Sequence, residues 1–148
     1  GIDIINTELF DALKLDEKLL SKSDYVLVDA PCSGLGLIRR RPEIKWNRKE
    51  DDIEKIKEMQ YIILRNASKY LKPGGILIYS TCTIEREENI NMIRNFITEN
   101  NEFQLVGFDH LLESKKNIET AEKGYIELFP HIHGTDGFFI AKLLKKDK

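Results

Sequence analysis

The amino-acid sequence predicts an α/β fold built on a parallel sheet. Two short runs, 24–30 and 76–79, are almost continuous in apolar, β-favouring residues. Such runs are typical of central parallel strands that are buried on both faces. Apolar residues recur at helical spacing between these runs and again after the second one. The resulting strand–helix–strand–helix–strand order implies a parallel sheet with right-handed crossovers.

The composition excludes several classes of protein. The chain has 148 residues, of which 41% are hydrophobic and 32% are charged, so we expect one globular domain rather than a disordered or fibrous chain. No apolar run approaches the ~20 residues of a membrane span. Cys32 and Cys82 are too few for a disulfide framework or a four-thiolate zinc site. A reducing, cytoplasmic location is therefore the default expectation.

The first half of the chain contains a weak strand, a loop and a long helix after the first run. Residues 4–10 have a weak strand pattern that ends at Asp11, and residues 31–47 are a loop rich in glycine and proline. Asn47 is expected to be the N-cap of the helix, with Glu50 completing a capping box. The segment 72–75 (Lys-Pro-Gly-Gly) is expected to end it.

The second half of the chain predicts one more helix and three strands. Thr83 is a candidate cap for a helix whose apolar face includes Ile90, Ile93 and Ile97. Strands are expected at 103–108, 126–129 and 138–144, and the polar segment 109–124 is expected to be a loop. No internal repeat or linker divides the chain.

Ligands of open α/β sheets bind at the carboxyl ends of the strands. Cys32 and Cys82 each directly follow a buried run, so both thiols face one site if the two strands are neighbours. A helix start next to Cys82 would lower the pKa of its thiol, and Glu85, Glu87 and Glu88 would oppose this effect. The alternative is a pair of buried, inert cysteines, which is the commoner situation.

Other polar residues have equally open interpretations. Asp29 ends an apolar strand, where a carboxylate requires a partner or caps a loop, and Asp11 by itself resembles a surface acid. Residues 38–49 hold six bases and one acid, a local charge of +5, and could bind phosphates or form a solvated loop. His131 and His133 lack an accompanying acid or cysteine cluster, so we expect no metal site.

Five ordered motifs resemble a known family. They are Asp29-Ala30-Pro31-Cys32-Ser33-Gly34, Arg39-Arg40-Arg41-Pro42-Glu43-Ile44-Lys45-Trp46, Lys72-Pro73-Gly74-Gly75, Ser80-Thr81-Cys82-Thr83 with Glu88-Asn89, and Gly134-Thr135-Asp136-Gly137-Phe138-Phe139. The sequence is similar, from about Ile4 to Leu144, to the RNA cytosine-5 methyltransferases, in particular to the bacterial Sun/Fmu-type (RsmB-like) branch. That branch modifies small-subunit (16S) ribosomal RNA.

The resemblance implies the Rossmann-like, S-adenosylmethionine-dependent methyltransferase fold, a seven-stranded sheet with an antiparallel last strand. This chain would supply only the later strands: the third at 4–10, the fourth at 24–29, the fifth at 76–80 and the final pair. Residues 1–148 would then be the C-terminal part of the catalytic domain, without the glycine-rich cofactor loop or the N-terminal RNA-binding domain. Met59 and Met92 are the only methionines, so we expect Gly1 not to be a translational start and the chain to be a fragment.

The resemblance also implies roles for individual residues. Cys82 would be the nucleophile that adds to C6 of cytosine and makes C5 electron-rich. Cys32 would assist release of the product, and Asp29 would lie near the target base and the methionine end of S-adenosylmethionine. Asp11 and Pro31 would contact this cofactor. The residues expected to bind ribosomal RNA are Arg39, Arg40, Arg41, Lys45 and Trp46.

Three other functions are weighed against this one. DNA cytosine-5 methyltransferases use the Pro-Cys thiol as nucleophile, and the second cysteine, Cys82, argues against that class. A non-catalytic fragment or RNA-binding module is favoured by the absent glycine-rich loop, which predicts weak or no binding of S-adenosylmethionine by the chain alone. A thiol-redox role is disfavoured because the cysteines do not form a Cys-x-x-Cys pair.

Overall fold

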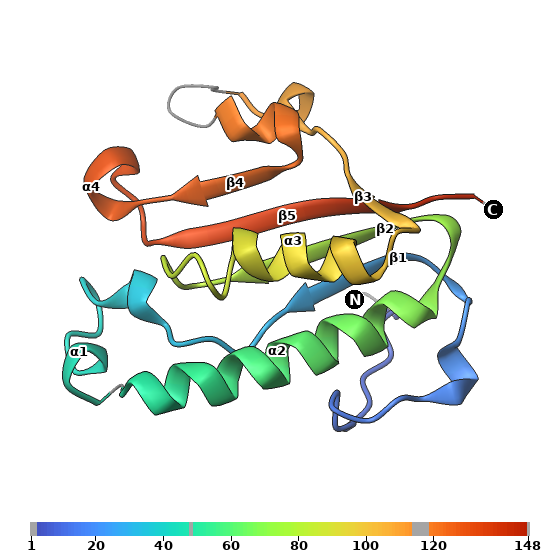
Figure 1. Cartoon of the computed structure of the whole chain (residues 1–148), viewed down its shortest axis with the longest axis horizontal. Coiled ribbons are helices and arrows are strands. Elements are labelled where there is room, and N and C mark those ends of the chain that lie inside the picture. The colour runs from blue at the N-terminus through green and yellow to red at the C-terminus, as the bar shows by residue number, and fades with distance from the viewer. Residues whose placement is uncertain (1–2, 48, 114–118, 148) are drawn as a thin grey trace.

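Five strands form one sheet in the computed structural model, which describes residues 3–47, 49–113 and 119–147 (Figure 1). Strand β1 (Ser23–Asp29) is parallel to β2 (Leu71–Thr81), and β5 (Phe138–Lys145) runs antiparallel to β2. Both β3 (Phe103–Leu105) and β4 (Tyr125–Leu128) pair antiparallel with β5. The order β1-β2-β5-β3, with an antiparallel last strand, confirms the expected Rossmann-like α/β fold and its neighbouring parallel strands at 24–29 and 76–80.

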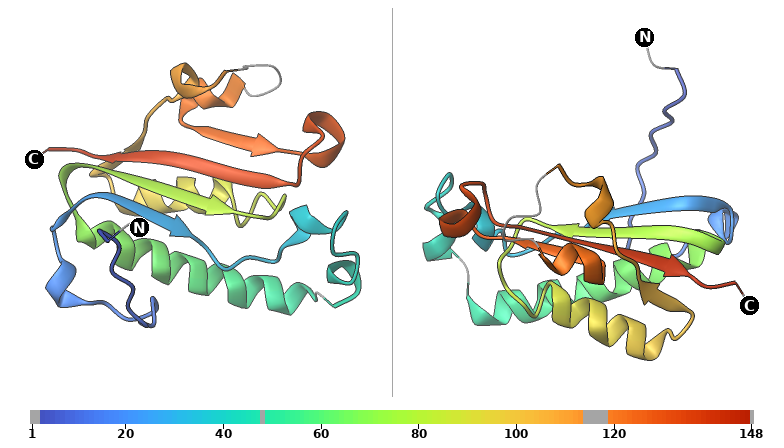
Figure 2. Two further views of the ribbon diagram at one scale, coloured as in Figure 1. Left: turned by 180° about the vertical axis from the view of Figure 1, so that it is seen from behind. Right: turned by 90° about the horizontal axis from the view of Figure 1, so that it is seen from above.

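Two helices, α2 (Glu50–Tyr70) and α3 (Ile90–Glu99), cover one face of the sheet (Figure 2). Their apolar sides pack on the alternate strand residues that point toward them, so Leu64 and Phe96 meet Leu77, Tyr79 and Phe139 in the main core. The remaining helical turns are short: η1 (Glu17–Leu19), η2 (Leu35–Leu37), α1 (Ile44–Asn47), η3 (Asp109–Leu111), η4 (Glu119–Lys123) and α4 (Pro130–His133).

The opposite face of the sheet is apolar and open over β1. The side chains of Tyr25 and Leu27 are 78% and 69% exposed, so the expectation that this strand is buried on both faces is wrong for the described chain. Beside them lies a shallow groove of about 350 Å³. Its lining residues are Tyr25, Ile76, Ile78, Phe108, Leu111, Ile140 and Lys142.

The N-terminal segment departs from the prediction. Residues 4–10 form no strand, are exposed, and leave the body of the fold on the side away from α2 and α3 (Figure 2). A strand is held by hydrogen bonds to a neighbouring strand, and the described chain pairs none with this segment. The apolar pattern alone was therefore insufficient to predict a strand at residues 4–10.

Helix starts and loop lengths also differ from the prediction. Helix α2 starts after Lys49, whose N–H donates to Asp52 Oδ2 at 3.2 Å, while Asn47 ends α1 instead of capping α2. Helix α3 begins at Ile90, with Asn89 rather than Thr83 at its N-cap position. The segment 72–75 lies at the beginning of β2. Strand β3 is shorter than expected, and η3 and η4 occupy parts of 109–124; residues 114–118 lie outside the described residues.

Candidate active site

The two cysteines lie side by side beyond the carboxyl ends of β1 and β2. Cys32 Sγ is 3.1 Å from Cys82 Sγ, and the Cys82 N–H donates to Cys32 Sγ at 3.3 Å. The register brings them together because Asp29 pairs with Ser80 and the Ala30 N–H extends the ladder to the Ser80 carbonyl. The expected proximity of the two thiols is confirmed. Both are half-buried and free.

This contact shifts the pKa values of the two thiols in opposite directions. Hydrogen bonding from the Cys32 thiol lowers the pKa of Cys82 to about 7, although burial and the nearby Asp29 and Glu88 carboxylates act in the opposite direction. The Cys82 side chain, followed by burial, raises the pKa of Cys32 far above the ordinary range. The helix start that was considered as a cause of a lowered pKa is absent at Cys82, because α3 begins only at Ile90.

Asp29 lies at the end of β1, close to the thiol pair. Its Oδ1 accepts a hydrogen bond from Ser80 Oγ at 2.9 Å, and the residue is exposed on the open face of the sheet. The partner that a carboxylate at this position requires is thus a hydroxyl on the neighbouring strand. An exposed anion beside a reactive thiol can attract a cationic ligand or exchange a proton with a bound base.

A buried carboxylate, Glu88, joins the loops that carry the cysteines. Its side chain accepts hydrogen bonds from the Ser33 N–H (2.8 Å), Ser33 Oγ (2.5 Å) and Gln60 Nε2 (2.9 Å). Gln60 Nε2 also donates to the Pro31 carbonyl at 2.8 Å. The backbone on both sides of Cys32 is therefore held by two buried side chains, one from α2 and one from the loop before α3.

The next residue, Asn89, holds the two residues that flank Cys82. Thr81 Oγ1 donates to Asn89 Oδ1 at 2.5 Å, and Asn89 Nδ2 donates to the Thr83 carbonyl at 3.0 Å. The hydroxyls of Ser33 and Thr83 are hydrogen-bonded to each other at 2.8 Å, which links the two loops directly. The sequence pattern indicated Glu88 as a charge near Cys82 and as part of a motif with Asn89, but it indicated no role for Gln60 or Ser33. The Glu88-Asn89 pair, part of the recognised motif, was the available signal.

The basic loop, residues 38–49, is solvent-facing apart from Ile38 and Ile44 in the part that the structure describes. Arg39 and Arg41 are exposed, and Trp46 is 79% exposed with Lys45 Nζ 5.2 Å from its ring centroid. Arg40 is engaged differently, because its Nη1 forms an ion pair with Asp136 Oδ2 at 2.8 Å. The loop is thereby tied to the turn before β5, and most of its bases remain accessible.

Asp11 and Pro31, the residues expected to contact the cofactor, occupy different places. Pro31 is exposed next to Cys32 and close to Asp29. Asp11 lies in an exposed turn, where its Oδ1 accepts the Leu13 N–H at 3.0 Å. The described contacts of Asp11 do not involve Asp29 or either cysteine.

The described part of the chain holds no candidate metal centre. No group of three or more histidine, cysteine, aspartate or glutamate side chains there could hold a metal ion. His133 Nδ1 accepts the Phe129 N–H at 2.8 Å, and this contact stabilises α4 locally. No helix among the described residues has the length and apolar character required to cross a membrane.

Comparison with known proteins assigns this chain to a family. Residues 1–144 match the family model described as 16S rRNA methyltransferase RsmB/F. The chain is 43% identical over 150 residues to the probable ribosomal RNA small subunit methyltransferase B of Bacillus subtilis (strain 168), covering 99% of this chain and 33% of that protein. It is 35% identical to the ribosomal RNA small subunit methyltransferase F of Aliivibrio salmonicida, covering 98% and 31%.

Two solved structures are also similar to this chain. The crystal structure of PH0851 superposes with a TM-score of 0.85 at 39% identity and covers 97% of this chain and 31% of that one. The structure of NSun6 from Pyrococcus horikoshii with SFG gives 0.73 at 34% identity, covering 94% and 34%. The chain thus spans about a third of the length of the relatives it matches. On the family match and these identities, the chain belongs to the 16S rRNA methyltransferase RsmB/F family.

Proposed function

We propose that this chain is the C-terminal part of a catalytic domain that transfers a methyl group from S-adenosylmethionine to C5 of a cytidine in 16S ribosomal RNA. The observation that carries the proposal is the Cys32–Cys82 pair, with its sulfurs 3.1 Å apart and Asp29 beside it. Membership of the rRNA methyltransferase family supports the substrate class. The target position and the covalent mechanism rest on the chemistry of the two thiols.

Cys82 acts as the nucleophile in this proposal. With its pKa lowered to about 7, a large fraction of its thiol is ionised near neutral pH. The thiolate adds to C6 of cytosine, and the displaced electron pair makes C5 nucleophilic enough to take a methyl group. Asp29 holds or relays the proton at N3 that neutralises the charge developing on the base.

Cys32 acts in the release step. While Cys82 is a thiolate, its negative charge and hydrogen bond keep Cys32 protonated. Once Cys82 is bonded to C6 both effects end, and the N–H groups of Cys82 and Gly34, which lower the pKa of Cys32, still act on its sulfur. Cys32 then loses its own proton to solvent water, and the resulting thiolate takes the proton from C5. The pair of electrons re-forms the C5–C6 double bond and expels Cys82 as a thiolate.

Residues at the carboxyl edge of β1 fit part of the cofactor site. S-Adenosylmethionine supplies the methyl group on a positively charged sulfur. The exposed Asp29 carboxylate lies beside the thiols and suits the cationic methionine end, and Pro31 borders the same position. A relative of known structure was solved with SFG, an analogue of this cofactor. Asp11 does not join this group in the described structure, so its assignment to the adenine end remains a prediction.

The basic loop is the proposed contact with ribosomal RNA. Arg39, Arg41 and Lys45 present exposed cations, and Trp46 presents an exposed ring on which a base can stack. The Gly36 N–H donates to the Cys82 carbonyl at 3.1 Å, so the segment that leads into this loop is adjacent to the nucleophile. A ribosomal RNA substrate also implies the cytoplasm as the proposed location.

A methylation assay with the full-length protein tests this function. We expect transfer from S-adenosylmethionine to 16S ribosomal RNA and mapping of the product to 5-methylcytosine. Methylation of a ribose, or of another base, would contradict the proposal. Transfer to DNA cytosine in preference to RNA would favour the DNA-enzyme alternative, and binding of RNA with no transfer would favour a non-catalytic module.

A further inference from the structure

Glu88 is a fully buried carboxylate that the methylation chemistry itself does not use. Its side chain has 0% exposure, and the described ion pairs do not include it. Burying a charged group is strongly unfavourable unless polar contacts compensate it. Here three donors do so, two from Ser33 and one from Gln60. An apolar side chain could fill the same space, which raises the question of what the carboxylate does.

The donors show what the carboxylate connects. Ser33 follows Cys32 directly, and Gln60 also holds the carbonyl of Pro31, which precedes Cys32. Glu88 therefore fixes the Cys32 loop against α2 through both neighbours of the cysteine. The Tyr79 hydroxyl donates to the Glu88 carbonyl at 2.9 Å and anchors the backbone of Glu88 itself to β2.

Glu88 also belongs to the segment that shapes the Cys82 loop. Asn89 bridges Thr81 and Thr83, the two neighbours of Cys82, and Thr83 is hydrogen-bonded to Ser33. Two consecutive residues thus hold both cysteine-bearing loops, one loop each. A shift of either loop by about 1 Å would break the contact between sulfurs that now lie 3.1 Å apart.

We propose that Glu88 is a positioning residue, which sets the separation of the Cys32 and Cys82 sulfurs by joining Ser33 and Gln60 to the loop before α3. The value of this separation for catalysis rests on the proposed methyl transfer. The separation itself is measurable through the thiols, whether or not methyl transfer occurs.

Two effects of Glu88 predict opposite changes in the pKa of Cys82 for Glu88→Gln: loss of its charge and loss of its positioning contacts. The negative charge raises the pKa of Cys82, so loss of charge alone would lower this pKa and speed alkylation at neutral pH. Loosening of the loops removes the hydrogen bond from Cys32, which is the largest cause of the lowered pKa. Positioning therefore predicts a higher pKa for Cys82. At pH 7, alkylation should slow by about fivefold for the first unit of increase and by about tenfold for each further unit.

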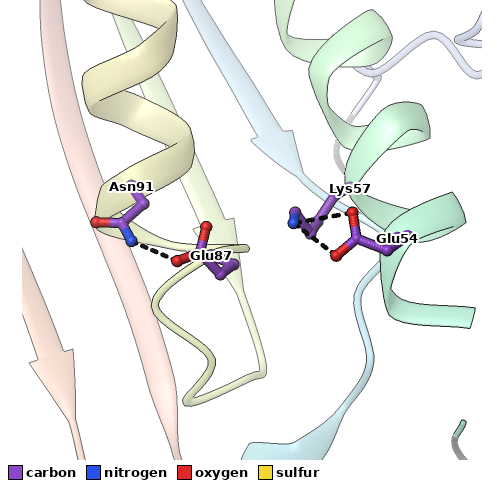
Figure 3. Close-up of polar contacts among 4 residues, drawn as sticks. All are labelled: Glu54, Lys57, Glu87 and Asn91. Carbon is purple, nitrogen blue, oxygen red and sulfur yellow. Dashed lines mark hydrogen bonds and ion pairs between the residues drawn. The ribbon is translucent and has the colours of Figure 1, made fainter. Parts of the chain in front are cut away.

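The experiment is a pH series of iodoacetamide alkylation on the full-length protein, with Cys82 modification followed by peptide mass spectrometry. Glu87→Gln is the matched control, because Glu87 is exposed and its Oε1 accepts only a solvent-facing hydrogen bond from Asn91 Nδ2 at 2.7 Å (Figure 3). Glu54→Gln is a second control, since Glu54 pairs with Lys57 on α2 in the same view. Both controls should match the wild-type profile.

A second variant covers the case in which Glu88→Gln does not fold. Ser33→Ala removes the hydroxyl contacts to Glu88 and Thr83 but keeps the Ser33 N–H, so a smaller slowing, of about threefold at pH 7, is expected. In methylation assays, kcat should fall while KM for S-adenosylmethionine stays unchanged. Unchanged or faster Cys82 alkylation in folded Glu88→Gln overturns the positioning role. Slower alkylation in a protein without methyl transfer supports that role and contradicts only the proposed function.

Discussion

Gly36 and Gly137 meet backbone to backbone beside the candidate nucleophile. The Gly137 N–H donates to the Gly36 carbonyl at 2.8 Å, and the Gly36 N–H donates to the Cys82 carbonyl at 3.1 Å. A Cβ atom on Gly36 would lie 2.2 Å from the Gly137 carbonyl oxygen. Three segments distant in sequence therefore converge at two positions where a side chain does not fit, and the segment that leads into the basic loop is attached to the Cys82 loop at this point.

The first prediction follows from this close approach. Gly36→Ala should destabilise the protein by about 1–3 kcal/mol, because backbone atoms must move apart, and should change the alkylation rate of Cys82. Gly134→Ala is the control: a Cβ there meets nothing within 4 Å, although the positive φ of 71° is unfavourable for alanine. Gly134→Ala should lower stability without altering the alkylation rate of Cys82. Thermal unfolding measures the stability of both variants, and alkylation measures the reactivity of Cys82. Equal changes in the Cys82 alkylation rate in the two variants would contradict the prediction.

The second prediction separates the two thiols. In the full-length protein, Cys82→Ala should abolish both methyl transfer and the covalent RNA adduct, because no sulfur remains to add to C6. Cys32→Ala should instead accumulate the adduct, since removal of the C5 proton is impaired. Denaturing gels of protein with labelled RNA measure both. An adduct that persists in Cys82→Ala and disappears in Cys32→Ala would reverse the roles.

The third prediction concerns pH. The wild-type Cys82 thiolate should form with a midpoint near pH 7, because donation from Cys32 favours the charged form. Cys32→Ala removes the donor and should move the midpoint to higher pH, so alkylation at pH 7 becomes slower. Cys32→Ser keeps a donating hydroxyl and should lie between the two. A midpoint that is the same in all three proteins would show that Cys32 does not stabilise the Cys82 thiolate.

The fourth prediction concerns the basic loop. Replacing Arg39, Arg40 and Arg41 by Ala should weaken RNA binding and reduce the slope of log K against log salt by about 0.7 for each phosphate that the loop no longer neutralises. Cofactor affinity should stay constant. Replacing Lys55 and Lys69, exposed bases on α2, is the control and should leave the slope unchanged. If the triple variant keeps the full slope, these arginines have a structural role, as the Arg40–Asp136 pair already does in part.

The fifth prediction concerns the open face of the sheet. Tyr25 and Leu27 expose apolar area on an edge strand, and such edges promote association. The chain expressed alone should therefore self-associate, and Leu27→Lys should reduce association as measured by light scattering. Ile132→Lys in α4, at a residue that is 48% exposed but outside this face, should have little effect. A monomeric wild-type chain would contradict the prediction.

The sequence by itself determined the core elements and the neighbourhood of the thiols. Residues 24–30 and 76–79 are short apolar runs of the length typical of strands, with a helix-length spacer between them, so a parallel β1–β2 pair could be predicted. Cys32 and Cys82 both follow the carboxyl ends of those strands, and their proximity follows from this topology. Local pattern was sufficient here because periodicity and connection length restrict the topology strongly.

Only the tertiary structure decided the remaining features, because they depend on partners distant in sequence. Residues 4–10 have a strand-like pattern but no neighbouring strand to complete their hydrogen bonds in the described chain, and Leu27 is exposed because no described layer covers its face. In the sequence, Glu88 resembles any acid before a helix. Its role depends on hydrogen bonds from Ser33 and Gln60, which belong to two other segments of the chain. The pKa of Cys82 likewise depends on a sulfur 50 residues away, and charge stabilisation of this kind is a property of distances in space.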